Sequence, residues 1–163
     1  MMKIGLLSDT HGYFDPRLTG FFKDCNEIWH AGDIGNIETA DSIAAFKPLV
    51  AVYGNIDDAH VRSVYPLQQR FTREGVDIFM THIGGYPGKY DRKVKELLLK
   101  YSPDLFISGH SHILKVINDK KLNILHINPG AAGKNGLHKV RTAVRFSLSE
   151  SRIHDMEIWE VHR

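Results

Sequence analysis

The sequence predicts an α/β fold in which two mixed β-sheets pack face to face with helices outside, a four-layer α/β/β/α sandwich. Three observations predict it. Short apolar runs alternate with helical patterns over the first two-thirds of the 163 residues. The last third instead contains consecutive strand patterns joined by short turns. In addition, five polar fragments each follow an apolar run, as expected where strands deliver side chains to a common site.

Five apolar runs in the first two-thirds are predicted to be buried strands, because each is short, rich in β-branched or aromatic residues and bounded by turn signals. They are Lys3–Ser8, Glu27–His30, Leu49–Tyr53, Val76–Met80 and Asp104–Ser108. Helical patterns lie between them at Ile37–Phe46 and Arg92–Tyr101. This alternation predicts a largely parallel sheet. We therefore expect the fragments that follow the five strands to lie along one edge of that sheet.

The last third predicts antiparallel pairing, since its strand patterns have short connections. The expected strands are Ile113–Ile117, Leu122–Ile127, Thr142–Leu148 and Ile153–Val161, with hairpin turns at 118–121 and 149–151. We therefore expect two sheets packed face to face, with helices outside. No linker or repeat divides the chain, so residues 1–163 are expected to form a single domain.

The five polar fragments supply seven potential metal ligands: two carboxylates, one amide and four imidazoles. They are Asp9, His11, Asp33, Asn55, His82, His110 and His112. Residues i and i+2 of an extended segment point to the same side, so Asp9 with His11, and His110 with His112, can each aim at one place. Taken singly, each has an ordinary structural explanation, for example a cap or a satisfied core histidine. Together they indicate a site for two divalent cations.

The order of these fragments (D-x-H, GD, GN, H, GHxH) resembles that of the calcineurin-like metallophosphoesterases. Within that family the chain is most similar to the small bacterial and archaeal phosphodiesterases of the YfcE type, and the resemblance spans Met2 to about Trp159. It implies the same four-layer fold and a single metallophosphoesterase domain. It also implies a first metal position formed by Asp9, His11, Asp33 and His112, and a second formed by Asp33, Asn55, His82 and His110. The Asp33 carboxylate would then bridge the two ions.

The charge balance of such a site suits a phosphate ester. Two divalent cations bring four positive charges and Asp9 and Asp33 return two negative ones, so an anionic ester and a hydroxide are attracted. We expect in-line attack on phosphorus by a metal-bridging hydroxide, with Asp33 and Asn55 acting in catalysis through the metals. The mixed imidazole and carboxylate ligands favour manganese, iron, zinc, cobalt or nickel over magnesium. We expect manganese, with iron, zinc, nickel or cobalt as alternatives.

Two departures from the wider family affect the substrate side. Many relatives carry a histidine directly after GN, where this chain has Ile56, so the general acid is left open. His60 and Asp57 are candidates, and an exposed solvated pair is the alternative. The loop 83–90 follows His82 and is rich in glycine; from it Tyr86, Lys89 and Tyr90 are predicted to bind substrate. The alternative is a surface loop whose tyrosines pack on the following helix.

Two further groups of polar residues are less specific. Lys134, His138, Lys139 and Arg141 form a basic cluster that can bind substrate phosphate, although such clusters are more often solvated faces. His30 lies inside a predicted strand before Gly32-Asp33 and is expected to be buried and hydrogen-bonded near the site.

The predicted function is that of a metal-dependent phosphodiesterase acting on a small phosphodiester or a nucleotide. A phosphomonoesterase is an alternative, because it differs only in substrate. A non-catalytic Vps29-like scaffold that binds protein partners is another, although that branch has lost some ligands and this chain keeps all seven. Alternating apolar residues on a C-terminal edge strand are also compatible with a homo-oligomer.

Composition narrows the classes of partner and location. A formal net charge of +2 and a pI of about 8.6 give no strong nucleic-acid-binding signal. The single cysteine, Cys25, excludes an internal disulfide framework and suits a cytoplasmic location. Met1-Met2-Lys3 leads directly into the first strand, so no signal peptide is expected, and no apolar run approaches the roughly 20 residues that span a bilayer.

Overall fold

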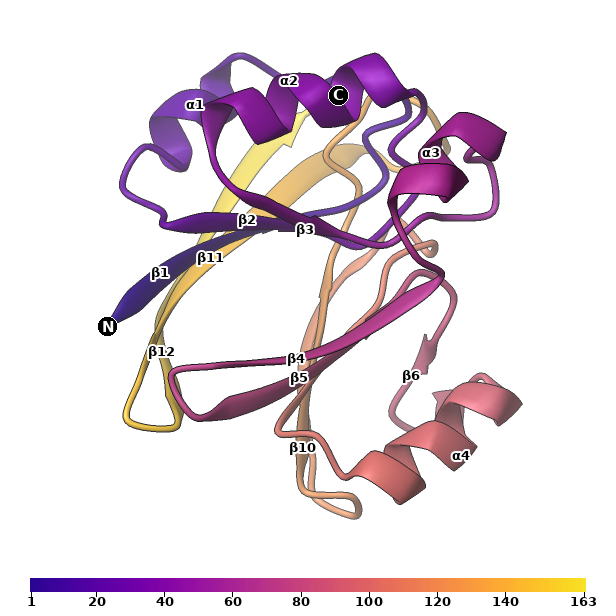
Figure 1. Ribbon diagram of the computed structural model, residues 1–163, viewed down its shortest axis with the longest axis vertical. Helices are drawn as coiled ribbons and strands as arrows, with labels where there is room; N and C mark the ends of the chain where they lie inside the picture. Colours follow the sequence, from indigo (N-terminus) through magenta and orange to yellow (C-terminus); the bar gives the residue numbers. More distant parts are fainter.

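The first of two five-stranded sheets holds the amino-terminal strands of the chain. The computed structural model describes residues 1–163 (Figure 1). The strand order of this sheet is β12-β11-β1-β2-β3. Strands β1 (Met2–Leu7), β2 (Glu27–His30) and β3 (Leu49–Ala51) are parallel, whereas β11 (Val140–Ser149) and β12 (Arg152–His162) continue the sheet in antiparallel fashion. The sheet is therefore mixed, with its parallel strands at one side.

The second sheet has the order β4-β5-β8-β10-β9. Its three central strands, β5 (Val76–Thr81), β8 (Leu105–Ile107) and β10 (Ile124–Pro129), are parallel. Its two edge strands, β4 (Gln68–Arg73) and β9 (Leu114–Asp119), are antiparallel to their neighbours. A separate two-stranded hairpin, β6 (Gly85–Tyr86) and β7 (Lys89–Tyr90), lies between β5 and the last helix in sequence.

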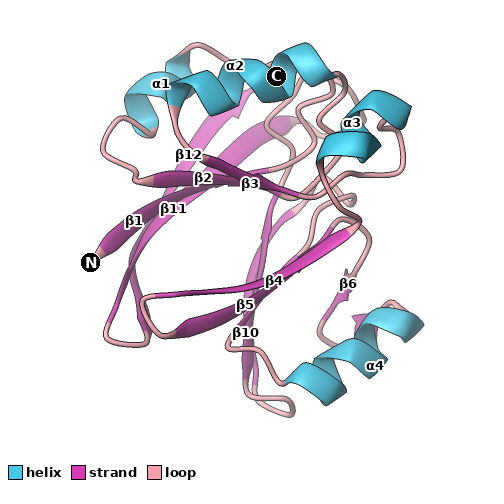
Figure 2. Ribbon diagram, in the orientation of Figure 1, coloured by secondary structure: helices cyan, strands magenta, loops and turns pink.

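Four helices cover the outer faces of the two sheets (Figure 2). Helices α1 (Arg17–Phe21), α2 (Ile37–Phe46) and α3 (Ala59–Val64) lie on the side of the first sheet, and α4 (Arg92–Tyr101) lies on the side of the second. Three of them begin with a side-chain oxygen that accepts a backbone N–H of the first turn. These capping residues are Asn36, Asp58 and Asp91. None of the helices is both long and apolar enough to cross a membrane.

The core is layered as the fold class requires. The cluster between the two sheets contains strand residues of both, and its members include Leu6, Trp29, Met80, Ile107, Ile127 and Phe146. A second cluster joins the outer face of the first sheet to α1 and α2, and a third joins the outer face of the second sheet to α4. Alternate residues of a strand point to opposite faces of the sheet, so each central strand contributes side chains to two layers of the core. The predicted α/β/β/α sandwich is confirmed.

The expectation that all five ligand-bearing strands share one sheet edge is wrong. Strands β1, β2 and β3 belong to the first sheet, but β5 and β8 belong to the second. The parallel order is interrupted by β4, which pairs antiparallel with β5 and starts a new sheet. Because the two sheets pack face to face, the carboxyl ends of both sets of strands still reach one region, which becomes the candidate site.

Candidate metal centre

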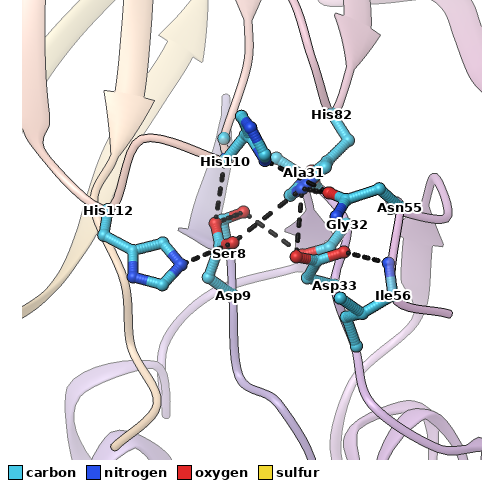
Figure 3. Close-up of polar contacts among 12 residues, drawn as sticks. Ser8, Asp9, Ala31, Gly32, Asp33, Asn55, Ile56, His82, His110 and His112 are labelled. Atoms are coloured by element: carbon cyan, nitrogen blue, oxygen red, sulfur yellow. Dashed lines mark hydrogen bonds and ion pairs between the residues drawn. The ribbon is translucent and has the colours of Figure 1, made fainter. Parts of the chain in front are cut away.

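The seven predicted ligands converge at the carboxyl ends of five strands from both sheets, and Figure 3 labels all of them except His11. Their ligand atoms form two groups in which all atoms lie within 4.8 Å of one another. The first group is Asp9, His11 and His112, and the second is Asp33, His82 and His110. Asn55 completes the second group, because its Oδ1 lies 3.1 Å from His82 Nε2 and 3.1 Å from His110 Nδ1. The structure therefore brings all seven together.

The Asp33 carboxylate lies between the two groups. Its Oδ2 is 3.5 Å from His11 Nε2 in the first group and 3.2 Å from His82 Nε2 in the second. Its other oxygen, Oδ1, accepts the Ile56 N–H at 3.1 Å. One carboxylate oxygen is thus held by the backbone while the other faces imidazoles of both groups.

Five of the seven candidate ligands have a left-handed backbone, which side-chain-bearing residues rarely adopt. They are Asp9 (φ 54°), His11 (φ 47°), Asp33 (φ 56°), His110 (φ 72°) and His112 (φ 64°). Each such residue costs of the order of 1–3 kcal/mol and persists only where the surrounding structure imposes it. Here the sharp turn after each strand directs the side chain toward the centre, so the cost falls on the residues that would bind metal.

Two glycines of the motifs are required by close approach. A Cβ on Gly54 would collide with the Asp33 carboxylate, and a Cβ on Gly109 would collide with Ser8 Oγ. Ser8 Oγ in turn donates to Asp9 Oδ2 at 2.6 Å, so the Gly109 position bears directly on Asp9. The glycines in GN and GH therefore let backbone pass beside the two carboxylates.

Both carboxylates are held in the ionised form. Burial raises the pKa of Asp9, but the neighbouring His11 and His112 imidazoles lower it by more, so the pKa lies well below its ordinary value. The pKa of Asp33 is likewise lowered, because the nearby His82 and the Ile56 N–H outweigh the effect of burial. In return Asp9 raises the pKa of His11. The centre thus carries two fixed negative charges facing imidazoles.

Two buried ligand atoms, Asp9 Oδ1 and His11 Nε2, make no hydrogen bond in the structure. They lie 3.7 Å apart, and His112 Nε2 lies 3.1 Å from the same Asp9 oxygen. Unpaired buried polar atoms are rare in native proteins and point to a missing ion, a water or a catalytic role. A divalent cation that accepts a lone pair from each atom would satisfy both of them. The donor atoms of the first group therefore fit a metal.

His82 in the second group has a tautomer set by the backbone. Its Nδ1 lies 2.8 Å from the Ala31 carbonyl oxygen, which can only accept a hydrogen bond, so Nδ1 carries the proton. The other nitrogen, Nε2, faces Asp33 and Asn55, and in the neutral ring it is the atom free to coordinate a cation. This is the arrangement that metal-binding histidines use, with one nitrogen donating and the other free to coordinate.

His30 and Asp57 support the centre from beneath. His30 is fully buried, its Nε2 lies 2.9 Å from Thr10 Oγ1, and its Nδ1 accepts the Gly32 N–H, as predicted. Burial lowers the pKa of His30 to about 4. Asp57 is also buried, so the alternative of an exposed, solvated pair of His60 and Asp57 is wrong for Asp57. Its carboxylate accepts the N–H groups of Ile34, Gly35 and Gly54 at 3.1, 2.8 and 2.8 Å.

Asp57 therefore clamps the GD turn to the GN turn and is not placed as a proton donor. His60, the other candidate for the general acid, is exposed on α3. Sequence reasoning missed the clamp because two adjacent aspartates give no sign of which one is buried.

Of the three predicted substrate-binding residues, only Tyr86 lies beside the candidate centre. It lines a cavity of about 100 Å³ together with His110, Ser111 and Lys115, and Lys115 Nζ sits 3.2 Å from the centre of the Tyr86 ring. Lys89 and Tyr90 instead line a separate cavity of about 600 Å³ that includes none of the seven ligands. Tyr90 packs on Phe106 beneath the hairpin.

The Tyr90 hydroxyl is also engaged, since it donates to Asp119 at 2.6 Å. Tyr90 thus has a packing role, as in the alternative for the loop, although its named contacts are with β8 and β9 and it reaches the following helix only through their shared apolar cluster. Sequence reasoning missed Lys115, whose position opposite Tyr86 depends on pairing of β9 within the second sheet.

The basic cluster is not a uniform solvated face. Arg141 is 2% exposed, donates twice to the Ala132 carbonyl oxygen and lies 3.0 Å from the Asp15 carboxylate. His138 contacts His112, a candidate ligand. Lys134 and Lys139 are exposed. Half of the cluster is therefore structural support for the loop that follows β10.

Comparison with known proteins fits this geometry. The model of the calcineurin-like phosphoesterase superfamily domain matches residues 2–151. The chain belongs to this family. A probable metallophosphoesterase of Mycoplasma pneumoniae is 31% identical to it over an alignment of 164 residue positions. The alignment covers 96% of each protein. This family of phosphoesterases binds divalent metals, and the two ligand groups are its candidate metal site here.

Solved structures share the fold at low sequence identity. Vps29 of Chaetomium thermophilum superposes with a TM-score of 0.75 at 15% identity, covering 98% of this chain and 95% of that one. A structurally characterised archaeal phosphodiesterase superposes with a TM-score of 0.73 at 21% identity, covering 99% of this chain and 100% of that one. The same architecture thus occurs in a protein described as a phosphodiesterase and in Vps29.

Proposed function

We propose that this metallophosphoesterase is a phosphodiesterase that uses two divalent ions, one in each ligand group. The observation that carries the proposal is the position of Asp33 Oδ2, which faces His11 at 3.5 Å and His82 at 3.2 Å. A carboxylate placed between two sets of imidazoles is suited to share two cations. The buried, unpaired Asp9 Oδ1 and His11 Nε2 further support the first position.

The residues that would hold the ions follow from the two groups. Asp9, His11, Asp33 and His112 would hold the first ion, and Asp33, Asn55, His82 and His110 the second. This mixture of imidazole and oxygen ligands suits manganese, with iron, zinc, nickel or cobalt as alternatives. When bound, such a pair of ions supplies Lewis acidity that polarises a phosphoryl group and acidifies water. The two carboxylates leave the pair with residual positive charge, which favours an anionic ester.

The surroundings of His110 support a diester as the substrate. Two cavities open on this residue, and they lie against different loops. One is the cavity with Tyr86 and Lys115 described above; the other, of about 430 Å³, is lined by Ile113 and Leu137. A diester has two substituents on phosphorus, and each cavity can accept one. The Lys115 side favours a polar or anionic substituent, whereas the Leu137 side favours an apolar one.

The decisive experiment measures hydrolysis of bis-p-nitrophenyl phosphate and p-nitrophenyl phosphate by metal-stripped protein, with and without added manganese. Turnover that requires manganese and is faster on the diester is the expected result. Faster turnover of the monoester would overturn the diester assignment in favour of a phosphomonoesterase. No turnover with any divalent metal would overturn catalysis altogether and favour a protein-binding scaffold.

A pair of lysine variants tests the substrate side. Lys115→Ala removes the cation beside Tyr86 and is expected to raise KM for an anionic diester by about 10-fold, equivalent to about 1.4 kcal/mol of lost binding. Lys89→Ala removes the lysine that pairs with Tyr86 in the β6–β7 hairpin. Lys89 lines the separate cavity of about 600 Å³, so this substitution should leave KM unchanged. Equal effects of the two substitutions would show that only general surface charge matters.

A further inference from the structure

His138 lies outside all five ligand fragments, in the loop between β10 and β11, yet it contacts a candidate ligand. Its Nδ1 lies 3.2 Å from His112 Nδ1, and the two rings are nearly perpendicular, with centroids 5.0 Å apart. Its other nitrogen, Nε2, lies 2.8 Å from the Gly133 carbonyl oxygen. Both ring nitrogens of His138 are therefore committed to specific partners.

The directions of these hydrogen bonds follow from the chemistry of the partners. A carbonyl oxygen can only accept, so His138 Nε2 must carry a proton and donate it to Gly133. A neutral imidazole has a single N–H, which leaves His138 Nδ1 as an acceptor. The contact between the two Nδ1 atoms then requires His112 Nδ1 to be the donor. This assigns the tautomer of both rings from one backbone carbonyl.

The consequence reaches the candidate metal position. When Nδ1 of neutral His112 carries the proton, its Nε2 holds a free lone pair. That atom lies 3.1 Å from Asp9 Oδ1, which is buried and makes no hydrogen bond (Figure 3). In the neutral ring these two lone-pair atoms repel each other unless a proton or a metal ion lies between them. The His112 tautomer therefore prepares the first ligand group for a metal.

The surrounding backbone closes these contacts into a ring. The Gly133 N–H donates to the Asp9 carbonyl oxygen at 3.1 Å, so the loop that anchors His138 is itself tied to a ligand residue. Gly136 packs against the two histidines, and a Cβ there would meet His112 Cε1 at 2.6 Å. Asp9, Gly133, His138 and His112 thus form a continuous circuit, and it leaves little room for either ring to turn.

We propose that His138 is a positioning residue that holds His112 in the Nδ1-protonated tautomer and so directs its Nε2 to the first metal ion. This inference rests on the proposed metal site, but it makes a statement about the metal-free protein that can be measured alone. Hydrogen bonds that orient a metal ligand in this way typically account for 10–100-fold in metal affinity. His138 therefore belongs to the site through its contact with His112, and it also lines the cavity of about 430 Å³ beside His110.

The direct test is a long-range proton–nitrogen NMR spectrum of the metal-free full-length protein labelled with ¹⁵N-histidine, recorded at mildly alkaline pH. The expected result is His112 protonated at Nδ1 and His138 protonated at Nε2. A spectrum in which His112 is protonated at Nε2 would overturn the proposal. Because no metal or turnover is involved, this result is independent of whether the protein proves to be a phosphodiesterase.

Variants at the same position provide the second test. In His138→Ala the acceptor is lost, so His112 should populate the other tautomer and manganese binding at one of two positions should weaken about 10-fold. His138→Gln keeps an acceptor oxygen and a donor amide, and it should restore the wild-type tautomer and affinity. His154→Ala is a matched control, since that histidine pairs with Ser149 and Asp155 away from the centre.

The proposal would be contradicted if His138→Ala left both the manganese affinity and the His112 spectrum unchanged. So would a Gln variant that behaves like Ala although its thermal unfolding matches that of the wild type. The wild-type spectrum keeps the test decisive even if the alanine variant does not fold.

Discussion

His82 and His112 stand in the two ligand groups, and the structure orients them by different means. His82 donates Nδ1–H to the Ala31 carbonyl oxygen, which is part of the backbone after β2. His112 contacts the side chain of His138 instead. A backbone carbonyl is present whatever the residue, whereas a side-chain acceptor depends on one residue in a loop. The second group is therefore built into the fold, and the first depends on residues outside the motif.

The largest expected effect comes from removing the residue that both groups share. Asp33→Ala should abolish binding of both ions and reduce manganese-dependent turnover by at least about 100-fold, because it deletes the carboxylate between His11 and His82. Elemental analysis and the diester assay measure this. Two bound ions with near-normal turnover in the variant would show that Asp33 is not shared.

The clamp beneath the second group should matter most for stability. Asp57→Ala leaves three backbone N–H groups without an acceptor, so the free energy of unfolding should fall by about 3 kcal/mol or more. Asp58→Ala is the matched control, because the carboxylate of Asp58 only caps α3. Its removal should lower the free energy of unfolding by about 1 kcal/mol. Urea unfolding of both metal-free variants gives the comparison, and equal losses would argue against the clamp.

Substituting the two compared histidines should separate their roles. His82→Ala leaves the Ala31 carbonyl oxygen unpaired in a fully buried setting, so about 2 kcal/mol of stability should be lost along with the second ion. His112→Ala should lose the first ion, but the free energy of unfolding should fall by less than about 1 kcal/mol, because water can reach the half-buried His138 in place of His112. Elemental analysis measures the bound ions and urea unfolding measures the stability of each variant. A larger loss of stability in His112→Ala than in His82→Ala would contradict the proposed difference between the two groups.

The smallest expected effect is a pH dependence of the free energy of unfolding through Asp15, whose carboxylate pairs with Arg17 and with Arg141 of β11. Arg17 and Arg141 outweigh burial and hold the pKa of Asp15 well below its usual range. A depressed pKa stabilises the folded state above the unfolded value of about 3.9, and this stabilisation is lost as the pH falls below it. Unfolding free energy should therefore drop by about 1 kcal/mol between pH 5 and pH 3 through this group. Asp15→Asn should lack that component, and an identical pH profile in the variant would contradict it.

The sequence predicted those parts of the molecule that local patterns specify. The bounds of α2 and α4 agree with the predicted helices, since Asn36 and Asp91 supply clear caps. All seven candidate ligands converge because each fragment follows a strand. The polar edge strand β4 was missed, because Gln68–Arg73 has no apolar run to mark it.

Features that depend on long-range contacts could not be predicted. The hairpin turn expected at 118–121 lies at 120–123, since the Asp119 carboxylate accepts the N–H groups of Lys121 and Leu122 and extends β9 to Asp119. The division of strands between two sheets, the burial of Asp57 and the contact of His138 with His112 all arise from tertiary packing. No spacing in the sequence records them.

The most direct test of the account is electron paramagnetic resonance of the protein titrated with manganese. Two ions that share the Asp33 carboxylate, about 3.5–4 Å apart as in other dinuclear sites, should couple magnetically. We predict that two equivalents bind and that a coupled dinuclear spectrum replaces the signal of isolated manganese, and that Asp33→Ala loses it. A spectrum of isolated ions only, or saturation at one equivalent, would contradict the shared centre.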